Sequence, residues 1–375
     1  MPESPEPDGY SIDSRLGRIV PPRPPGETPM HAVPISPPVS AHPADARITA
    51  FPVPSADPAE EPHFMTTSDR PAPARTGLRG LLSGIGIRVA PGPVEQANRD
   101  SDARLRRDEE LIRQATWTRA VGVLVANRKG GVGKTPVSLL LAGTLASIRG
   151  GSVCVVEVSD DPGSLTFRAE GSPHLGLGEL MADVGSISSA GQLAGYTAPQ
   201  TSFASVIGSV GDRPPLTRDH VAAVAAVIDE YYSIRVMDSG NQSSSSAFDG
   251  AIESADALVI PVLNSGDAVL EALALLDRLR RQGGRQAELA DRAVILRLND
   301  GRPQHPQVME RINRIIAGAG SSHVFEVPYD SHIAERGQLT LGKLDPATYR
   351  VFAATAAAIV CSVKVPAGSP GPPER

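Results

Sequence analysis

The residues best suited to chemistry lie between an apolar run and a leucine-rich segment, in a stretch rich in glycine and lysine. Residues 121–135 read VGVLVANRKGGVGKT. Glycines let successive backbone N–H groups turn toward one point, and a helix that begins there directs its positive end to the same point. A lysine offers a mobile charge to phosphate oxygens, and a threonine hydroxyl can bind Mg²⁺. The stretch therefore predicts a phosphate-binding loop between a strand and a helix.

This loop departs from the common form of such loops at one position. The common form requires a glycine five positions before Gly133, and Arg128 stands there instead. A second lysine, Lys129, precedes the paired glycines. The chain has four lysines among its 36 basic residues, and Lys129 and Lys134 are two of them. Because arginine is the usual cation of this chain, two lysines in one loop indicate a need for compact ammonium groups, which suit phosphate.

The Lys-Gly-Gly-x-Gly-Lys-Thr form resembles the deviant Walker A loop of the ParA/MinD family of ATPases. The resemblance implies ATP and Mg²⁺ as cofactors and a homodimer in the ATP state. It also implies that Lys129 crosses the dimer interface to the partner's nucleotide, so that Lys129 and Lys134 both act in catalysis. The loop residues that the resemblance assigns to nucleotide binding are Gly130, Gly131, Val132, Gly133, Lys134, Thr135 and Pro136.

A carboxylate follows a later apolar strand, as in a Walker B motif. The expected strand Ile234–Met237 ends at Asp238, followed by Ser239-Gly240-Asn241. A single carboxylate at the tip of a buried strand can hold Mg²⁺ together with Thr135, and the small residues after it can shift with the γ-phosphate. The alternative is an ordinary aspartate at a strand end. We expect Thr135 and Asp238 to be the metal-binding residues.

An acidic loop follows the strand after the first helix. Residues 157–166 read EVSDDPGSLT, and the resembled family carries an Asp-x-Asp-Pro switch here whose second aspartate positions the attacking water. Asp161 matches that aspartate best because it directly precedes Pro162, and Asp160 is its rival. If Glu157 stands for the first aspartate, two extra residues precede the Asp-Pro pair; otherwise Ser159 takes the first position. This departure bears on the hydrolysis rate more than on nucleotide binding.

Two further segments resemble the base-binding end of the same family. Asn299 follows an expected strand, where relatives place a base-contacting asparagine, and Pro328-Tyr329-Asp330 resembles the loop that lines the adenine. A turn asparagine and a loop proline are equally compatible with these strings. Asn299 and Pro328 are therefore candidate nucleotide-binding residues.

Strands and helices alternate along the rest of the chain, which predicts an α/β fold with a doubly wound, mostly parallel sheet and helices on both faces. The strands are nearly continuous apolar runs, as expected for strands covered on both sides. The expected strands are Val121–Ala126, Val153–Val158, 203–208, Ile234–Met237, Ala257–Val262, Ala293–Leu298 and 323–327. The expected helices are Pro136–Arg149, 218–231, 246–254, 267–281, 307–317 and Pro346–Val363.

Composition divides the 375 residues into four segments. The first 100 residues hold 20 of the 35 prolines without sustained periodicity, so they cannot bury enough apolar surface to offset their ordering entropy. We expect a disordered Pro-rich tail at 1–75, then an apolar docking patch (78–89) and a charged, solvent-exposed lead-in helix (94–115) within 76–116. A ParA/MinD-like ATPase domain over 117–364 and a disordered C-terminal tail at 365–375 complete the expected organisation.

Charge and cysteine content limit the class of protein. The net charge of −6 argues against a surface built as a whole for nucleic acid, although a local basic patch remains compatible with it. The two cysteines, Cys154 and Cys361, lack metal-ligand spacing. The acidic, Pro-rich start is unlike a signal peptide, and no apolar run approaches the roughly 18 residues of a membrane span. We expect a cytoplasmic protein without stable membrane insertion.

These features predict an Mg-ATP-binding and -hydrolysing dimerisation switch that positions or partitions a cargo. One cargo is non-specifically bound DNA, as in plasmid or chromosome partitioning, contacted by a basic cluster (Arg278, Arg280, Arg281, Arg285 and Arg292). The alternative for this cluster is a solvated face balanced by Asp277, Glu288 and Asp291. A partner protein that stimulates hydrolysis or binds the Pro-rich tail is also expected.

Two alternative functions stay open. The strings after Asp238 and around Pro328, with the long Pro-rich leader, resemble MinD-like ATPases linked to type VII secretion loci. That resemblance implies a regulatory ATPase of a secretion system, recruited through its tail. The irregular acidic loop at 157–163 favours a third reading, a nucleotide-binding scaffold with negligible hydrolysis.

Overall fold

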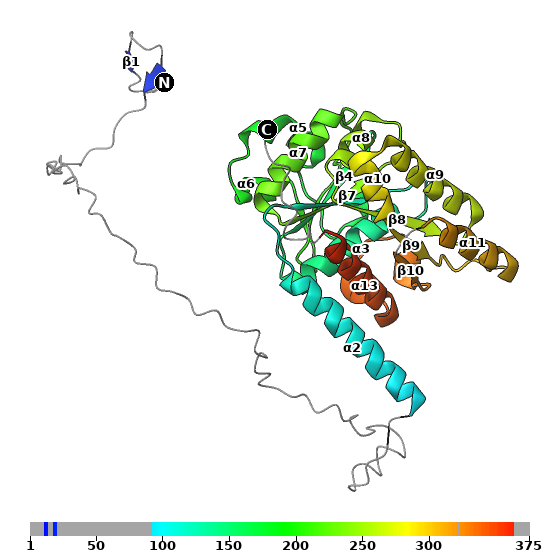
Figure 1. Ribbon diagram of the computed structural model, residues 1–375. Helices are drawn as coiled ribbons and strands as arrows, with labels where there is room; N and C mark the ends of the chain where they lie inside the picture. Colours follow the sequence, from blue (N-terminus) through cyan, green and yellow to red (C-terminus); the bar gives the residue numbers. More distant parts are fainter. Residues whose placement is uncertain (1–10, 14–17, 21–89, 91, 321–322, 364–375) are drawn as a thin grey trace, which may run out of the picture. The chain divides into compact units, whose positions relative to one another are not determined.

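The computed structural model describes residues 11–13, 18–20, 90, 92–320 and 323–363 (Figure 1). Contacts divide the chain into two units, Met1–Asp69 and Arg70–Arg375. In the first unit, β1 (Ser11–Asp13) and β2 (Arg18–Val20) form an antiparallel pair. Apart from these strands, the expected tails and the apolar patch at 78–89 lie outside the described residues.

The second unit is built on one eight-stranded sheet with the strand order β10-β9-β8-β3-β7-β4-β6-β5. Each neighbouring pair is parallel except β5 with β6, so the predicted fold class is confirmed. The strands are β3 (Val121–Val125), β4 (Val153–Val158), β5 (Ala198–Pro199), β6 (Ser205–Ile207), β7 (Ile234–Ser239), β8 (Ala257–Leu263), β9 (Val294–Leu298) and β10 (His323–Val327).

Helices cover both faces of this sheet (Figure 1). Alternate residues of each central strand face opposite layers: Val123 and Val125 pack with one group of helices, and Leu124 packs with the other. The first layer holds α3 (Lys134–Arg149) and α13 (Pro346–Val363), with α2 (Pro93–Gln114) outside them. The second layer holds α5 (Leu177–Asp183), α7 (Arg218–Tyr231), α8 (Ser246–Glu253), α9 (Gly266–Gln282), α10 (Gly284–Asp291) and α11 (Pro306–Gly318).

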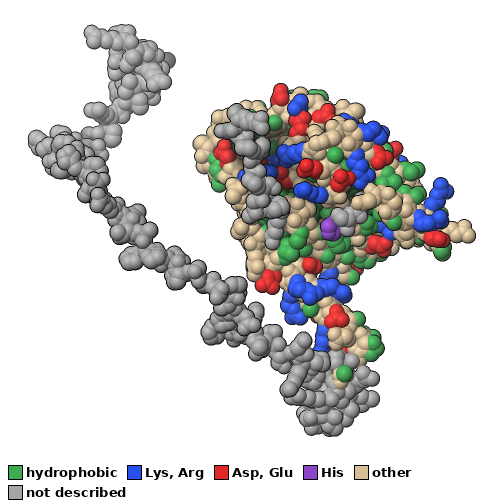
Figure 2. Space-filling view, in the orientation of Figure 1, with side chains coloured by type: hydrophobic (Ala, Val, Ile, Leu, Met, Phe, Trp, Pro, Cys, Tyr) green, Lys and Arg blue, Asp and Glu red, His purple; other side chains and the backbone are tan. Residues whose placement is uncertain are grey.

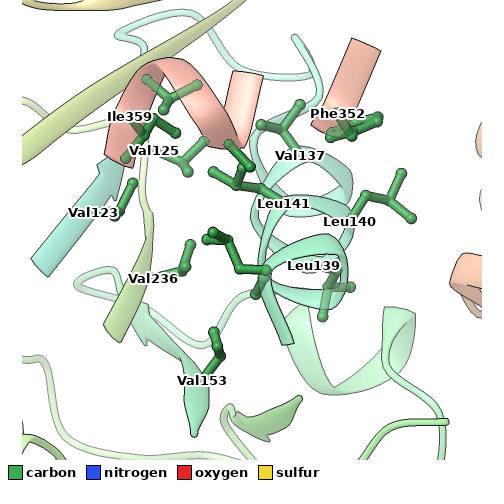
Figure 3. Close-up of a cluster of buried hydrophobic side chains, with 14 of the residues drawn as sticks. Val123, Val125, Val137, Leu139, Leu140, Leu141, Val153, Val236, Phe352 and Ile359 are labelled. Atoms are coloured by element: carbon green, nitrogen blue, oxygen red, sulfur yellow. The ribbon is translucent and has the colours of Figure 1, made fainter. Parts of the chain in front are cut away.

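The core of the first layer joins the helix after the phosphate loop to the C-terminal helix. Figure 3 shows Val137 and Leu141 of α3 facing Val123 and Val125 of β3, with Ile359 of α13 beside them. These side chains are fully or almost fully buried, and burying each contributes about 1.5–3 kcal/mol. The buried cluster fixes the direction in which α3 leaves the loop.

The helix α13 is also long and apolar enough, by length and composition, to cross a membrane, and it is the one helix of this kind in the described part of the chain. Its Phe352, Ala356 and Ile359 lie in the buried cluster against α3. The apolar composition of α13 is accounted for by this packing.

The segment expected to form a lead-in helix is α2, which contacts the domain at one end. Its inner end packs on α3 and α13, where Ile112 is completely buried. Arg350 of α13 pairs with Asp102 at 3.0 Å. Ile112 is the one buried residue of α2, and the remaining residues of this helix are exposed or half-buried.

Several short elements were not expected from the sequence. The helices among them are α4 (Leu165–Arg168), α5, α6 (Ala190–Ala194), α10 and α12 (Ser331–Ala334). The others are the 3-10 helices η1 (Val184–Ser186) and η2 (Leu341–Lys343) and the strand β5. Most are too short to show a hydrophobic period. The expected longer elements agree with the observed ones within one or two residues at each end.

Candidate functional site

The loop between β3 and α3 owes its shape to glycines and to one buried asparagine. Gly131 and Gly133 have φ angles of 74° and 95°, positive values that residues other than glycine rarely adopt. A Cβ on Gly133 would lie 2.9 Å from the Leu298 side chain. Asn127 is completely buried, donates to the Pro261 carbonyl at 2.8 Å and accepts from the Lys129 N–H at 2.9 Å. The loop is therefore anchored to β8 at its start and packed against the end of β9 at its close.

The Lys134 ammonium is buried without a carboxylate of its own. The side chain is 8% exposed, and Nζ donates to the Lys129 carbonyl at 3.2 Å and to Asn241 Oδ1. Burial lowers the pKa of Lys134 to about 8, opposed in part by the charge of Asp238. A phosphate ligand would supply the counter-charge that this ammonium lacks among the described residues.

Two hydroxyls of α3 hold the Asp238 carboxylate at the end of β7. Thr135 Oγ1 donates to Oδ2 at 2.7 Å, and Ser138 Oγ donates to Oδ1 at 3.1 Å. Burial raises the pKa of Asp238 to about 6, while these two hydrogen bonds lower it. The carboxylate and the Thr135 hydroxyl are the hard oxygen donors that Mg²⁺ prefers. The residues present therefore fit an Mg²⁺ ion.

Both predicted ends of the nucleotide site line one cavity of about 530 Å³. The predicted site residues in its wall are Gly131, Gly133, Lys134, Thr135, Pro136, Asp238, Asn299 and Pro328. Gly130, Val132, Lys129 and Asp161 are not part of the wall. Asn299 Oδ1 also accepts from the Gly301 N–H at 2.9 Å, so this asparagine shapes a turn as well as the cavity.

Lys129 lies in an adjoining hollow and forms an ion pair within its own chain. Its Nζ is 3.0 Å from Asp267 Oδ2, and the Lys129 side chain is 45% exposed. Its neighbour Arg128 pairs with Glu271 at 3.3 Å. Both acids lie in the first turns of α9. An exposed ammonium at this place can leave Asp267 at little cost, since exposed pairs contribute about 0–1 kcal/mol.

The acidic loop after β4 is fastened from a distant part of the chain. Arg213, whose side chain is 1% exposed, pairs with Glu157 at 2.8 Å and donates to the carbonyls of Ser159, Asp160 and Asp161 at 2.8–3.1 Å. We call this set the Arg213 clamp. It holds the backbone of the expected switch in place.

Glu157, the next-to-last residue of β4, lines the cavity, whereas Asp161 in the loop after β4 does not. Glu157 is almost completely buried, and its Oε1 accepts from Arg213, Ser209 and the Gly163 N–H, whereas its Oε2 has no hydrogen-bond partner. Asp160 and Asp161 line a neighbouring hollow that they share with Asn241. The water-positioning role of Asp161 stays a prediction, and Glu157 is a second carboxylate to test.

Ion pairs occupy most of the basic cluster expected to contact DNA. Arg278 pairs with Asp249, Arg280 with Asp277 and Asp291, and Arg285 with Asp256. Figure 2 likewise shows basic and acidic side chains interspersed on the visible face of the domain. The cluster has the balanced charge of a solvated surface.

Residues 123–340 match the CobQ/CobB/MinD/ParA nucleotide binding domain, a match that covers more than half of the chain. The chain belongs to this family. The matched segment includes the phosphate loop, Asp238, Asn299 and Pro328, and it ends before α13.

Relatives of known sequence or structure agree with this membership. The ESX-1 secretion-associated protein EspI of Mycobacterium tuberculosis, recorded for two strains, is 24% identical over 283 residues, which cover 73% of this chain and 40% of EspI. The chain thus spans well under half the length of these relatives. A ParA family ATPase from Chlorobium tepidum TLS superposes with a TM-score of 0.52 at 16% identity, over 63% of this chain and 98% of that structure. At this identity the likeness concerns the fold.

Several residues that build the CobQ/CobB/MinD/ParA site here were not predicted from the sequence. Ser138 lies three residues after Thr135, a helical spacing that could have revealed its contact with Asp238. Asn127 and Asn241 lie close to predicted motifs in the sequence, and this closeness could have identified them as site residues. Two arginines gave no such signal, because neither lies near a recognisable motif: Arg213 of the clamp, and Arg168 in the cavity wall.

Proposed function

We propose that this chain is an Mg-ATP-dependent switch of the ParA/MinD type that binds ATP, dimerises and hydrolyses the nucleotide. One observation carries the proposal. The buried Lys134 ammonium and the Asp238 carboxylate, the latter held by Thr135 and Ser138, line a single cavity that also contains Asn299. That set provides a cation for phosphate, oxygen ligands for a divalent metal and a turn that can receive a base.

In this proposal each group of the chain has a stated task. Backbone N–H groups of the loop and the Lys134 ammonium bind the β- and γ-phosphates. The negative charge of these phosphates compensates the buried positive charge of Lys134. Thr135 and Asp238 hold Mg²⁺, which when bound neutralises charge that develops on the phosphates. Lys129 leaves Asp267 and reaches the nucleotide of a second copy.

The decisive experiment measures Mg-ATP affinity, hydrolysis and oligomeric state of the full chain together. Lys134→Ala should abolish ATP binding, and Lys129→Ala should leave binding intact while removing ATP-dependent dimers. Lys343→Ala is the matched control, because Lys343 is an exposed lysine outside the cavity. Absence of ATP binding in the wild type would overturn the proposal, and binding without dimers or turnover would favour the scaffold function.

The carboxylate that positions the attacking water is decided by a second comparison. Glu157→Gln, Asp161→Asn and Asp160→Asn differ from the wild type by one charge each. Loss of turnover with retained ATP binding in only one of them identifies the residue. Glu157 lines the cavity and has a buried Oε2 atom without a hydrogen-bond partner, and Asp161 has the sequence match, so each is a specific candidate.

For the cargo, the relative EspI favours an association with a secretion system over DNA. Arg278, Arg280 and Arg285 already form ion pairs with acidic residues of the chain, which makes them less suited to bind DNA phosphates. We propose that residues 1–75 recruit a partner from such a system. Deleting them should abolish partner capture and leave ATP hydrolysis intact. ATP-dependent, salt-sensitive DNA binding that Arg280→Glu with Arg281→Glu removes would instead support partitioning.

A further inference from the structure

Two arginines in the cavity wall lack any acidic partner. Arg168, the last residue of α4, is 92% buried, and its Nη2 atom has no hydrogen-bond partner, while its Nε donates to the Gly337 carbonyl at 2.6 Å. Arg336 lies in the same wall. Neither residue forms an ion pair within the part of the chain that the structure describes. Burial, and then the nearby charge of Arg336, lower the pKa of Arg168.

The backbone holds these two like charges together. The Leu339 N–H donates to the Arg168 carbonyl at 2.8 Å, which together with the bond to Gly337 fastens the end of α4 to the segment after α12. Arg336 has a φ of 57°, the left-handed region that non-glycine residues rarely occupy. A strained backbone conformation persists where the surrounding structure imposes it, and residues with such conformations cluster at ligand-binding sites.

A third arginine in the wall of the same cavity has an acidic partner, unlike Arg168 and Arg336. Arg302 also lines the wall, but it pairs with Asp300 at 3.1 Å, and its side chain is 75% exposed. Burying a charge without a partner costs free energy, so the buried Arg168, with the exposed Arg336 as a second cation nearby, is more stable with an anion beside it. A phosphate accepts hydrogen bonds from a guanidinium fork in a bidentate manner.

We propose that Arg168 and Arg336 form an anion subsite for a phosphate group of the nucleotide whose other phosphates Lys134 binds. This inference rests on the proposed function, since it assumes that the cavity takes a nucleotide. The subsite lies at the end of α4, which begins directly after the clamped loop of residues 159–164. A phosphate bound there ties that loop to the segment after α12.

The test measures Mg-ATP affinity in variants that remove or keep the charge. Asparagine tolerates the left-handed conformation, so Arg336→Asn removes the charge without adding backbone strain. It should weaken Mg-ATP binding by about ten-fold or more, as expected for loss of a charge-assisted phosphate contact. Arg336→Lys should keep most of the affinity, and Arg168→Gln should lose it. The control Arg314→Gln, an exposed arginine outside the cavity, should stay within about two-fold of wild type.

A second readout separates ligand binding from a structural role. Removing one of two adjacent like charges should leave the thermal midpoint of ligand-free Arg336→Asn equal to that of wild type or above it, whereas a structural role predicts a lower midpoint. Unchanged ATP affinity in both Arg336→Asn and Arg168→Gln, with binding lost in Lys134→Ala, would overturn the inference alone. Failure of the wild type to bind Mg-ATP would overturn the proposed function and the subsite with it.

Discussion

Two loops of the cavity are held in place by opposite means. The phosphate loop between β3 and α3 takes its shape from its own residues, with Gly131 and Gly133 in left-handed conformations and Asn127 fastened beneath. The loop after β4 is fastened by Arg213, which lies beyond β6 and β5. A contiguous motif can therefore specify the first loop, whereas the second depends on one distant side chain.

The Arg213 clamp should be the most sensitive point of this comparison. Arg213→Met leaves the Glu157 carboxylate buried without its cation, and breaking a buried pair in this way costs about 3–5 kcal/mol. Urea unfolding of the full chain measures the loss. Arg218→Met is the control, because Arg218 and Glu253 form an exposed pair whose loss should cost less than about 1 kcal/mol. Equal losses of unfolding free energy in the two variants would show that the clamp adds no more stability than an exposed ion pair.

The pH dependence of stability tests the carboxylate that joins the two loops. Asp238 pairs in register with Glu157 on the neighbouring strand, and its pKa is raised from 3.8 to about 6. A carboxyl with a raised pKa stabilises the fold fully below about pH 4, and this contribution is lost as the pH rises through about 6.

Asp238→Asn should therefore be more stable than wild type at pH 7 in metal-free buffer, by about 1–3 kcal/mol. The difference should shrink toward pH 4, where the wild-type carboxyl holds its proton. Denaturant unfolding at pH 4, 5.5 and 7 measures it. A difference that is constant across these pH values would contradict the raised pKa.

The phosphate loop itself predicts a difference between its glycines. Gly133→Ala combines a φ of 95° with a Cβ 2.9 Å from the Leu298 side chain, so it should cost about 1–2 kcal/mol. Gly131→Ala has a similar φ but open space around the new Cβ, so its cost should be about 1 kcal/mol or less. Unfolding curves of the two variants give the order, and a larger cost at Gly131 would refute the role of the Leu298 contact.

The smallest effect is expected at the ion pair that holds Lys129. Asp267→Asn should change the free energy of unfolding by less than about 1 kcal/mol, because the pair is exposed. If Lys129 serves a second copy, the same variant should strengthen ATP-dependent dimers by less than about ten-fold. Glu271→Gln, which frees Arg128 instead, is the control. Weaker dimers in Asp267→Asn would contradict the proposal.

Much of the fold could be predicted from the sequence, because buried parallel strands and amphipathic helices carry strong patterns. The run 121–126 and the helix 218–231 appear almost as expected. The phosphate loop and its companion Asp238 could be located because strand ends place them at one edge of the sheet. The Arg213 clamp and the Arg168–Arg336 pair could not, since their geometry arises from contacts between segments far apart in the chain. The short elements between 165 and 199 carry too few residues to show a period.

The strand order has a consequence for how the chain reaches this state during synthesis. Both neighbours of β3 come from much later in the chain, with Val121 beside Ile234 and Val123 beside Ala257. Pairings this distant in sequence form slowly, because a long loop must close before any contact is gained. The phosphate loop leaves the ribosome well before β7 and β8 do. The cavity, whose wall extends to Pro328, therefore forms completely only in a chain whose translation has passed β10.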